Sequence, residues 1–188
     1  MKYALIFLTA AATSLAAFGA ASLTGPEPAQ AASGKQVRTC GGGTMILNNA
    51  EHRMLVLHNQ ARRNHGLRPL CIHPRLQRAA RYHSRDMIQN NYFSHTSRNG
   101  QSFQQRLKRF GYPPNSCRAS GVGENIAWGR GQQGWPGPIF QNWMNSSGHR
   151  ANILARQFRH VGIGVAGGTY RGMNNVRMYT VDFGYCRR

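Results

Sequence analysis

The sequence predicts an α+β fold in a single domain. Stretches with helical periodicity come first, and the runs richest in β-branched and aromatic residues come near the end. A helical group followed mainly by strands is typical of an α+β sandwich. A doubly wound parallel fold would instead alternate strands and helices from the start. Once an export signal is removed from the 188 residues, the remaining length matches one domain.

The first 31 residues have the pattern of a signal peptide. A basic start at Lys2 precedes an uncharged apolar run over 4–18, which is too short to span a bilayer comfortably. Residues 29–31 have the small-x-small pattern of a cleavage site, so we expect cleavage after Ala31. An uncleaved N-terminal anchor is the alternative. No second apolar stretch approaches transmembrane length, so we expect a secreted, soluble protein with no transmembrane segment after cleavage.

Residues 32–47 are rich in glycine and polar side chains, which predicts a linker fastened at Cys40. The domain itself is expected over 48–188. In its first helix, Asn48 and Glu51 have the spacing of a capping box, and the helical periodicity continues to Gly66. A second helix is predicted to begin at Pro74, since proline suits the first helical position, and to end near 90–91.

A third, shorter helix is predicted from Ser102 to Gly111, with Gln105 completing a second capping box. Pro113 and Pro114 prevent its continuation. Residues 123–129 then predict a strand or an extended cavity wall, because they are few, bounded by glycine and partly apolar.

The last third of the chain predicts one helix and two strands. The helix follows 136–138, and its apolar side chains come from Ile139, Phe140, Trp143 and Met144. The strands are expected over 160–166 and 176–185, with 167–175 as the hairpin loop between them.

Four widely spaced cysteines favour two disulfides over a metal cluster in an exported chain. Three connectivities are possible. We favour Cys40–Cys71, which would clamp the two ends of the first helix, and Cys117–Cys186, which would tie a central loop to the last strand.

The charge is strongly unbalanced, with 24 basic residues against 5 acidic ones and a net charge of +19. All but three of the basic residues are arginine. Such an excess creates a long-range field that attracts anionic polymers, although the arginines are dispersed along the chain and codon bias would explain them equally well. We expect no specific nucleic-acid recognition, because aromatic residues spaced for base stacking are not evident.

Three residues are candidates for a functional site. His95 follows the second helix in a partly aromatic segment, and His149 lies in a loop after the fourth helix. Glu124 lies in an apolar run, where a carboxylate needs a cation or several donors. One of the histidines could supply that cation, or an arginine could, in a salt bridge that holds the sheet to a helix.

Two histidines and a glutamate could also hold zinc, with Glu124 as a ligand or as the base that activates water. The positive field favours neutral imidazoles but repels the metal ion. A hydrolytic zinc site normally uses three ligands and a base, so three candidate groups are a weak indication. Serine and cysteine nucleophiles are disfavoured, because the G-x-S-x-G elbow is missing and the cysteines suit disulfides.

Four stretches resemble the CAP superfamily of cysteine-rich secretory, antigen 5 and pathogenesis-related 1 proteins, in its bacterial SCP-domain branch. They are LHNQARRNHGLRPL (57–70), AARYHSRDMIQNNYFSH (79–95), GENIAWG (123–129), and WMNSSGHRANIL with FRHVGIGVA (143–154 and 158–166). The resemblance covers about residues 50–186. It implies a three-layer α-β-α sandwich.

The resemblance also implies a central ligand cavity that contains His95, Glu124 and His149. At the fourth cavity position, where many eukaryotic relatives have glutamate, this chain has Ser146. The missing acid weakens any mechanism that needs two carboxylates. Family members are linked to lipid binding, cell-surface interaction and contested proteolysis, so the fold does not settle the function.

We therefore expect a monomeric extracellular binding module rather than an enzyme, with a lipid, a peptide or a cell-wall component as its ligand. One alternative is a zinc-dependent hydrolase in which His95 and His149 hold the metal and Glu124 activates water. The other is an adhesin that binds anionic polymers through its arginines.

Overall fold

The computed structural model describes residues 34–187, so the predicted signal peptide lies outside the described residues. At its centre is a four-stranded sheet with the order β3-β5-β6-β4. The strands are β3 (Cys71–Ile72), β4 (Ala119–Arg130), β5 (His160–Tyr170) and β6 (Met173–Arg187). Strands β4 and β5 both pair antiparallel with β6, and β3 pairs parallel with β5.

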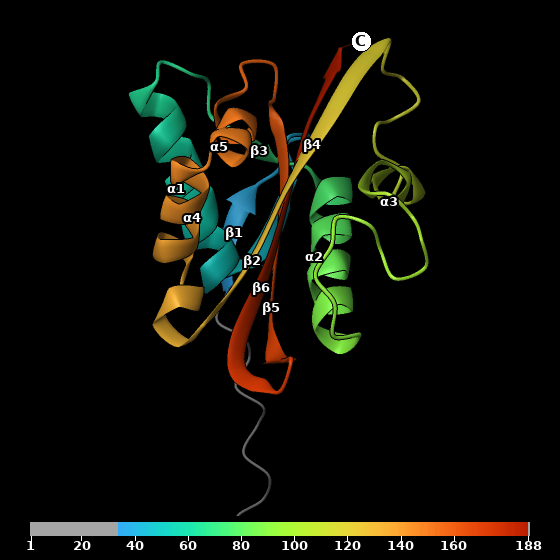
Figure 1. Ribbon diagram of the computed structural model, residues 1–188. Helices are drawn as coiled ribbons and strands as arrows, with labels where there is room; N and C mark the ends of the chain where they lie inside the picture. The colour runs from blue at the N-terminus through green and yellow to red at the C-terminus, as the bar shows by residue number, and fades with distance from the viewer. Residues whose placement is uncertain (1–33, 188) are drawn as a thin grey trace, which may run out of the picture. The chain divides into compact units, whose positions relative to one another are not determined.

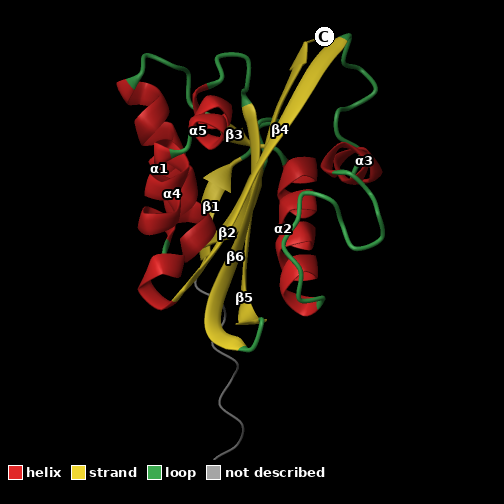
Figure 2. Cartoon of the chain, in the orientation of Figure 1, coloured by secondary structure: helices red, strands yellow, loops and turns green. Residues whose placement is uncertain are grey.

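Helices cover both faces of this sheet (Figure 1). On one face lie α1 (Asn49–Asn64), α4 (Pro136–Asn145) and α5 (Ser147–Leu154), and on the other lie α2 (Pro74–Gln89) and α3 (Phe103–Arg109). A short 3₁₀ helix over Gly131–Gly134 links β4 to α4. The colouring by secondary structure in Figure 2 makes the three layers clear and confirms the predicted α-β-α sandwich.

The helix boundaries follow from the local sequence signals. Both predicted capping boxes form, with Asn48 and Glu51 at the start of α1 and with Ser102 and Gln105 at the start of α3. Helix α2 begins with Pro74, whose missing N–H costs nothing at that position. These ends were predictable because each cap is made within four residues of sequence.

The predicted linker over 32–47 is wrong for its described part, because residues 34–48 form a hairpin. Strand β1 (Gly34–Arg38) pairs antiparallel with β2 (Thr44–Asn48), and the glycines of 41–43 lie in the turn. Leu47 is fully buried in the main core, which anchors the hairpin. The apolar residues of β2 therefore favour a strand, which the glycine content of the segment did not indicate.

The second correction concerns residues 147–154, which form α5 rather than a loop, so His149 is a helical residue. The hairpin loop predicted over 167–175 is also shorter. Strand β5 continues to Tyr170, and β6 begins at Met173. The turn between them consists of Arg171 and Gly172, both at positive φ. Of the two alternatives predicted for 123–129, the strand is confirmed, because these residues lie within β4.

Helix α2 packs unusually close to β5 because two strand positions are glycine. A Cβ atom on Gly162 would lie 2.1 Å from the carbonyl carbon of Leu76, and one on Gly164 would lie 2.2 Å from the carbonyl oxygen of Ala80. From the same helix, the side chains of Gln77 and Ser84 donate hydrogen bonds to backbone carbonyl groups of β5. The contact therefore fixes α2 against the sheet.

Two disulfides brace the domain. Cys40–Cys71 joins the end of the hairpin to β3, and Cys117–Cys186 joins the loop before β4 to the end of β6. Their Cα–Cα distances of 5.2 and 5.3 Å lie in the usual range, and the pairing is the one favoured from the sequence. Within residues 34–187, no helix has both the length and the apolar character needed to cross a membrane.

Candidate functional site

Glu124 is the centre of the candidate site. Its carboxylate is buried, although β4 is an edge strand of the sheet. One carboxylate oxygen lies 2.7 Å from Nδ1 of His95, and the other pairs with the guanidinium of Arg106. Burial alone would raise the pKa of Glu124, but the His95 hydrogen bond and the Arg106 charge together hold it below its ordinary value.

Arg106 links this carboxylate to the loop that carries His95. The guanidinium is fully buried on α3, and its Nη1 donates to the backbone carbonyl of His95 (3.1 Å) and to the Ser97 hydroxyl (2.9 Å). The sequence left an arginine and a histidine as alternative partners of Glu124. The structure has both, because Arg106 and His95 each contact the carboxylate. Arg106 was not identified from the sequence, since nothing local distinguishes it from the other arginines.

His83 fixes the same loop from α2. Its Nε2 lies 2.9 Å from the backbone carbonyl of Ser94, so the imidazole donates to the residue just before His95. Burial and the nearby Arg106 charge lower the pKa of His83 to about 4, so the ring is neutral at physiological pH. Tyr92 adds a hydrogen bond to Asp86. Together with the Arg106 bond from α3, the His83 bond from α2 therefore holds the backbone around His95 from two helices.

Asp182 is a second buried acid beside Glu124. The two residues are direct partners in the β4–β6 register, and Asp182 is fully buried. Neither of its carboxylate oxygens accepts a bond from any N–H or O–H donor of the described residues. Burial and the negative charge of Glu124 raise the pKa of Asp182 well above its ordinary value. The pair therefore holds one proton, with Asp182 neutral and Glu124 ionised.

His149 belongs to the other side of the site. Its Nδ1 lies 2.8 Å from the Ser146 hydroxyl, its ring stacks near Trp143, and its backbone carbonyl accepts a bond from Asn125 of β4. Burial and the charge of His95 lower the pKa of His149. Among the three candidates, the described residues show one direct bond, between His95 and Glu124, and His149 bonds instead to Ser146.

Comparison with known proteins decides the family. The profile of the cysteine-rich secretory protein family, CAP, matches residues 55–183. The chain belongs to the CAP family. The uncharacterized protein YkwD of Bacillus subtilis is 40% identical over 114 residues, which are 61% of this chain and 41% of YkwD. The chain thus spans less than half of that CAP relative.

Solved structures agree with the CAP assignment. An extracellular SCP-domain protein from Bacillus anthracis is 32% identical, with a TM-score of 0.57, over 74% of this chain and 40% of that protein. An outer surface protein of Borrelia burgdorferi is 17% identical, with a TM-score of 0.59, over 82% of this chain and 100% of its own. The second likeness concerns the fold alone.

Ser146 of this CAP domain bonds to His149, and the acid beside Glu124 is Asp182, which was not identified from the sequence. The sequence held one signal for it. A lone aspartate inside the apolar run of 176–185 must be neutral or paired if that strand is buried. Which residue it would face depended on the strand register, which the sequence did not provide.

The residues do not fit the three-ligand zinc centre considered from the sequence. Within the described part of the chain, the ligand atoms of His95, Glu124 and His149 do not all lie within 4.8 Å of one another. Each oxygen of Glu124 already accepts a hydrogen bond, from His95 or from Arg106, and the side chain has no exposed surface. Only the Nε2 atoms of the two histidines remain as donors, one fewer than a catalytic zinc site uses.

Proposed function

We propose that this protein is a secreted, non-enzymatic binding module that recognises a polar ligand through His95 and His149. The ligand class is a cell-wall fragment or peptide with hydroxyl or amide groups. The extracellular SCP-domain protein of Bacillus anthracis supports the location, since this chain shares its domain at 32% identity.

The observation that carries the proposal is the state of Glu124. A general base must have a free lone pair directed at the proton that it removes. Here one oxygen accepts from His95 and the other from Arg106, and the side chain has no exposed surface through which water could reach the remaining lone pairs. Glu124 is therefore suited to orient the imidazole and not to activate water.

The exposed part of the site is the His95 ring. Its side chain is 51% exposed, whereas its Nδ1 is held by Glu124. Because an ionised carboxylate only accepts, Nδ1 of His95 donates to Glu124, and Nε2 remains free for a ligand. A polar ring nitrogen held in a fixed orientation suits a hydroxyl or amide group of the ligand better than an alkyl chain, which disfavours a lipid.

Titration with soluble muropeptides, followed by calorimetry, tests this function. We expect saturable binding that falls at least tenfold in His95→Ala and in His149→Ala. The matched control is His65→Ala, because His65 is exposed at the end of α1 and its side chain bonds only within that helix. Equal binding by all variants, or the appearance of cleaved muropeptide, would overturn the proposal.

A further inference from the structure

The outer face of α2 carries a row of arginines. Arg75, Arg78, Arg81 and Arg85 are separated by three, three and four residues, a spacing that places them on one side of a helix. Arg109 at the end of α3 lies beside the row, with its guanidinium 4.6 Å from the ring centre of Tyr82. The dispersion of arginine seen along the whole sequence conceals this local order.

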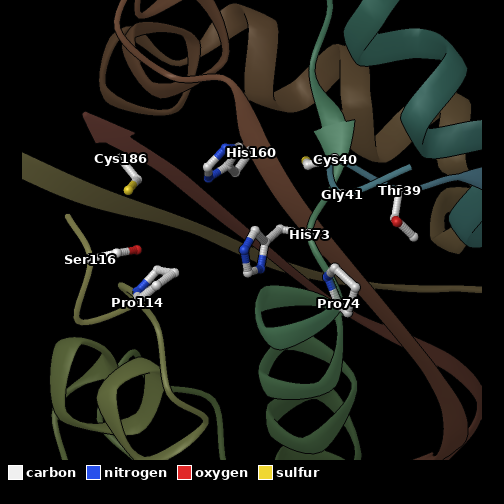
Figure 3. Close-up of a pocket in the computed structure, with 9 residues that line it drawn as sticks. All are labelled: Thr39, Cys40, Gly41, His73, Pro74, Pro114, Ser116, His160 and Cys186. Atoms are coloured by element: carbon white, nitrogen blue, oxygen red, sulfur yellow. The ribbon is translucent and has the colours of Figure 1, made fainter. Parts of the chain in front are cut away.

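Three hollows adjoin one another along this row. The hollow in Figure 3, of about 630 Å³, is lined by His73, His160 and Ser116 among others. It shares Pro114 and Ser116 with a second hollow of about 650 Å³, which contains Arg75, Arg78 and Arg109. The second shares Arg78 and Phe110 with a third of about 560 Å³, which extends to Arg85. We call these three hollows together the α2–α3 groove.

The two imidazoles at one end of the groove are fixed as hydrogen-bond donors. Nδ1 of His73 accepts the backbone N–H of Arg75 (3.3 Å), and Nδ1 of His160 lies 2.9 Å from the Tyr112 hydroxyl. Burial raises the pKa of Tyr112, so this hydroxyl keeps its proton, and we assign it as the donor of the bond to His160. Burial also lowers the pKa of both histidines, that of His73 to about 4. Each neutral ring therefore carries its proton on Nε2, and it can donate to an anion but cannot serve as an acid at neutral pH.

Apart from Arg81, the arginines of the groove have no acidic partner among the described residues. Arg81 is paired with Glu51, but Arg78 and Arg85 are exposed and make no ion pair among residues 34–187. Among the residues that the structure describes, Asp86 is the only acid that lines the groove, and it accepts from Tyr92 and Asn90. A counter-charge for the row must therefore come from another molecule.

We propose that the α2–α3 groove binds a linear phosphodiester polymer of the base-free, polyol-phosphate type. Guanidinium groups bind phosphate in a two-pronged geometry, and the imidazole N–H groups add donors at one end. The row from Arg75 to Arg85 covers ten residue steps of α2 and so spans roughly 15 Å at 1.5 Å per residue, which suits a chain of phosphates better than a single one. Arg109 also lies over the rings of Tyr82 and Phe110, which leaves less of their surface for stacked bases.

The test compares two variants of equal charge with poly(glycerol phosphate) as the probe. The groove variant is Arg78→Gln/Arg85→Gln/Arg109→Gln. The control is Arg53→Gln/Arg63→Gln/Arg156→Gln, whose three arginines are likewise exposed and come from α1 and the segment after α5, across the sheet. We expect at least a tenfold loss of affinity in the groove variant and less than a threefold loss in the control. Equal losses would show a diffuse charge effect and overturn the proposal.

Two further measurements define the ligand class. Single-stranded DNA and polyglutamate with the same number of charges should bind more weakly than poly(glycerol phosphate), and binding that is equal or tighter would refute the base-free phosphate assignment. In the NMR spectrum, the imidazole N–H signals of His73 and His160 should shift on binding in the wild-type protein. The inference is independent of the proposed function, because muropeptide binding at His95 should be unchanged in the groove variant.

Discussion

Asp182 lies directly opposite Glu124 in the antiparallel pairing of β4 with β6, and both carboxyl groups are buried. Two carboxylates at such a position cannot both be ionised without a large electrostatic cost. Arg106 and His95 contact Glu124, whereas Asp182 has no donor among the described residues. The environment therefore assigns the charge to Glu124 and the proton to Asp182.

The first prediction concerns the pH dependence of stability. The pKa of Asp182 is raised in the folded state, so its contribution is fully present below the unfolded value near 3.8 and is lost as the pH rises through the folded pKa. In Asp182→Asn this loss should disappear, since the amide never ionises. Urea unfolding from pH 4 to 9 checks this. As the pH rises, the free energy of unfolding of the wild type should fall relative to that of the variant. Parallel curves would mean that Asp182 titrates normally.

The second prediction concerns Arg106. Its replacement in Arg106→Leu leaves the buried carboxylate of Glu124 without its main cation, and we expect a loss of about 3–5 kcal/mol in the free energy of unfolding. Adding Glu124→Gln should recover part of this loss, because the uncompensated charge is then gone. A double variant that is as unstable as the sum of the two single ones would argue against their pairing.

The third prediction concerns the contact between α2 and β5. A methyl group in Gly164→Ala meets the backbone of Ala80, which cannot move without displacing the helix, so we expect a loss of about 1–3 kcal/mol. Gly148→Ala is the control, since a Cβ there meets nothing within 4 Å and the residue lies in α5. The control should be unchanged or more stable by up to about 1 kcal/mol. Thermal unfolding of both variants checks the difference.

The fourth prediction concerns acid unfolding. Burial lowers the pKa of His58 from 6.5 to about 4, so the unfolded state binds more protons than the folded state between these values. Stability should fall as the pH drops from 6.5 to 4, by about 3 kcal/mol for this residue. His58→Leu should unfold with a weaker pH dependence over this range. Equal slopes in the two proteins would contradict the prediction.

Much of the fold could be predicted because its signals are local. Capping boxes, proline at the start of α2 and the apolar runs of β5 and β6 each lie within a few residues. The hairpin over 34–48 and α5 could not be predicted in the same way. The first depends on burial of Leu47 by distant elements, and the second begins with serine and glycine, which have low helix propensity.

The candidate site shows the same division. His95 and Glu124 stood out because their residue types are scarce and their surroundings apolar, and they are in contact. Arg106, His83 and Asp182 were missed, since each acts through a partner on another element. Side chains that meet across strands or between helices are specified by register and packing, which a single sequence does not display.

The distribution of acids has a consequence for the behaviour of the protein in solution. Within residues 34–187, Glu51, Glu124 and Asp182 are buried and Asp86 is half-buried with internal partners. Two copies of this domain therefore present positively charged surfaces to each other. None of these four acids has a fully exposed carboxylate that could form an ion pair between the copies. We expect mutual repulsion in dilute buffer that keeps the copies dispersed, and closer approach as added salt shortens the range of the field.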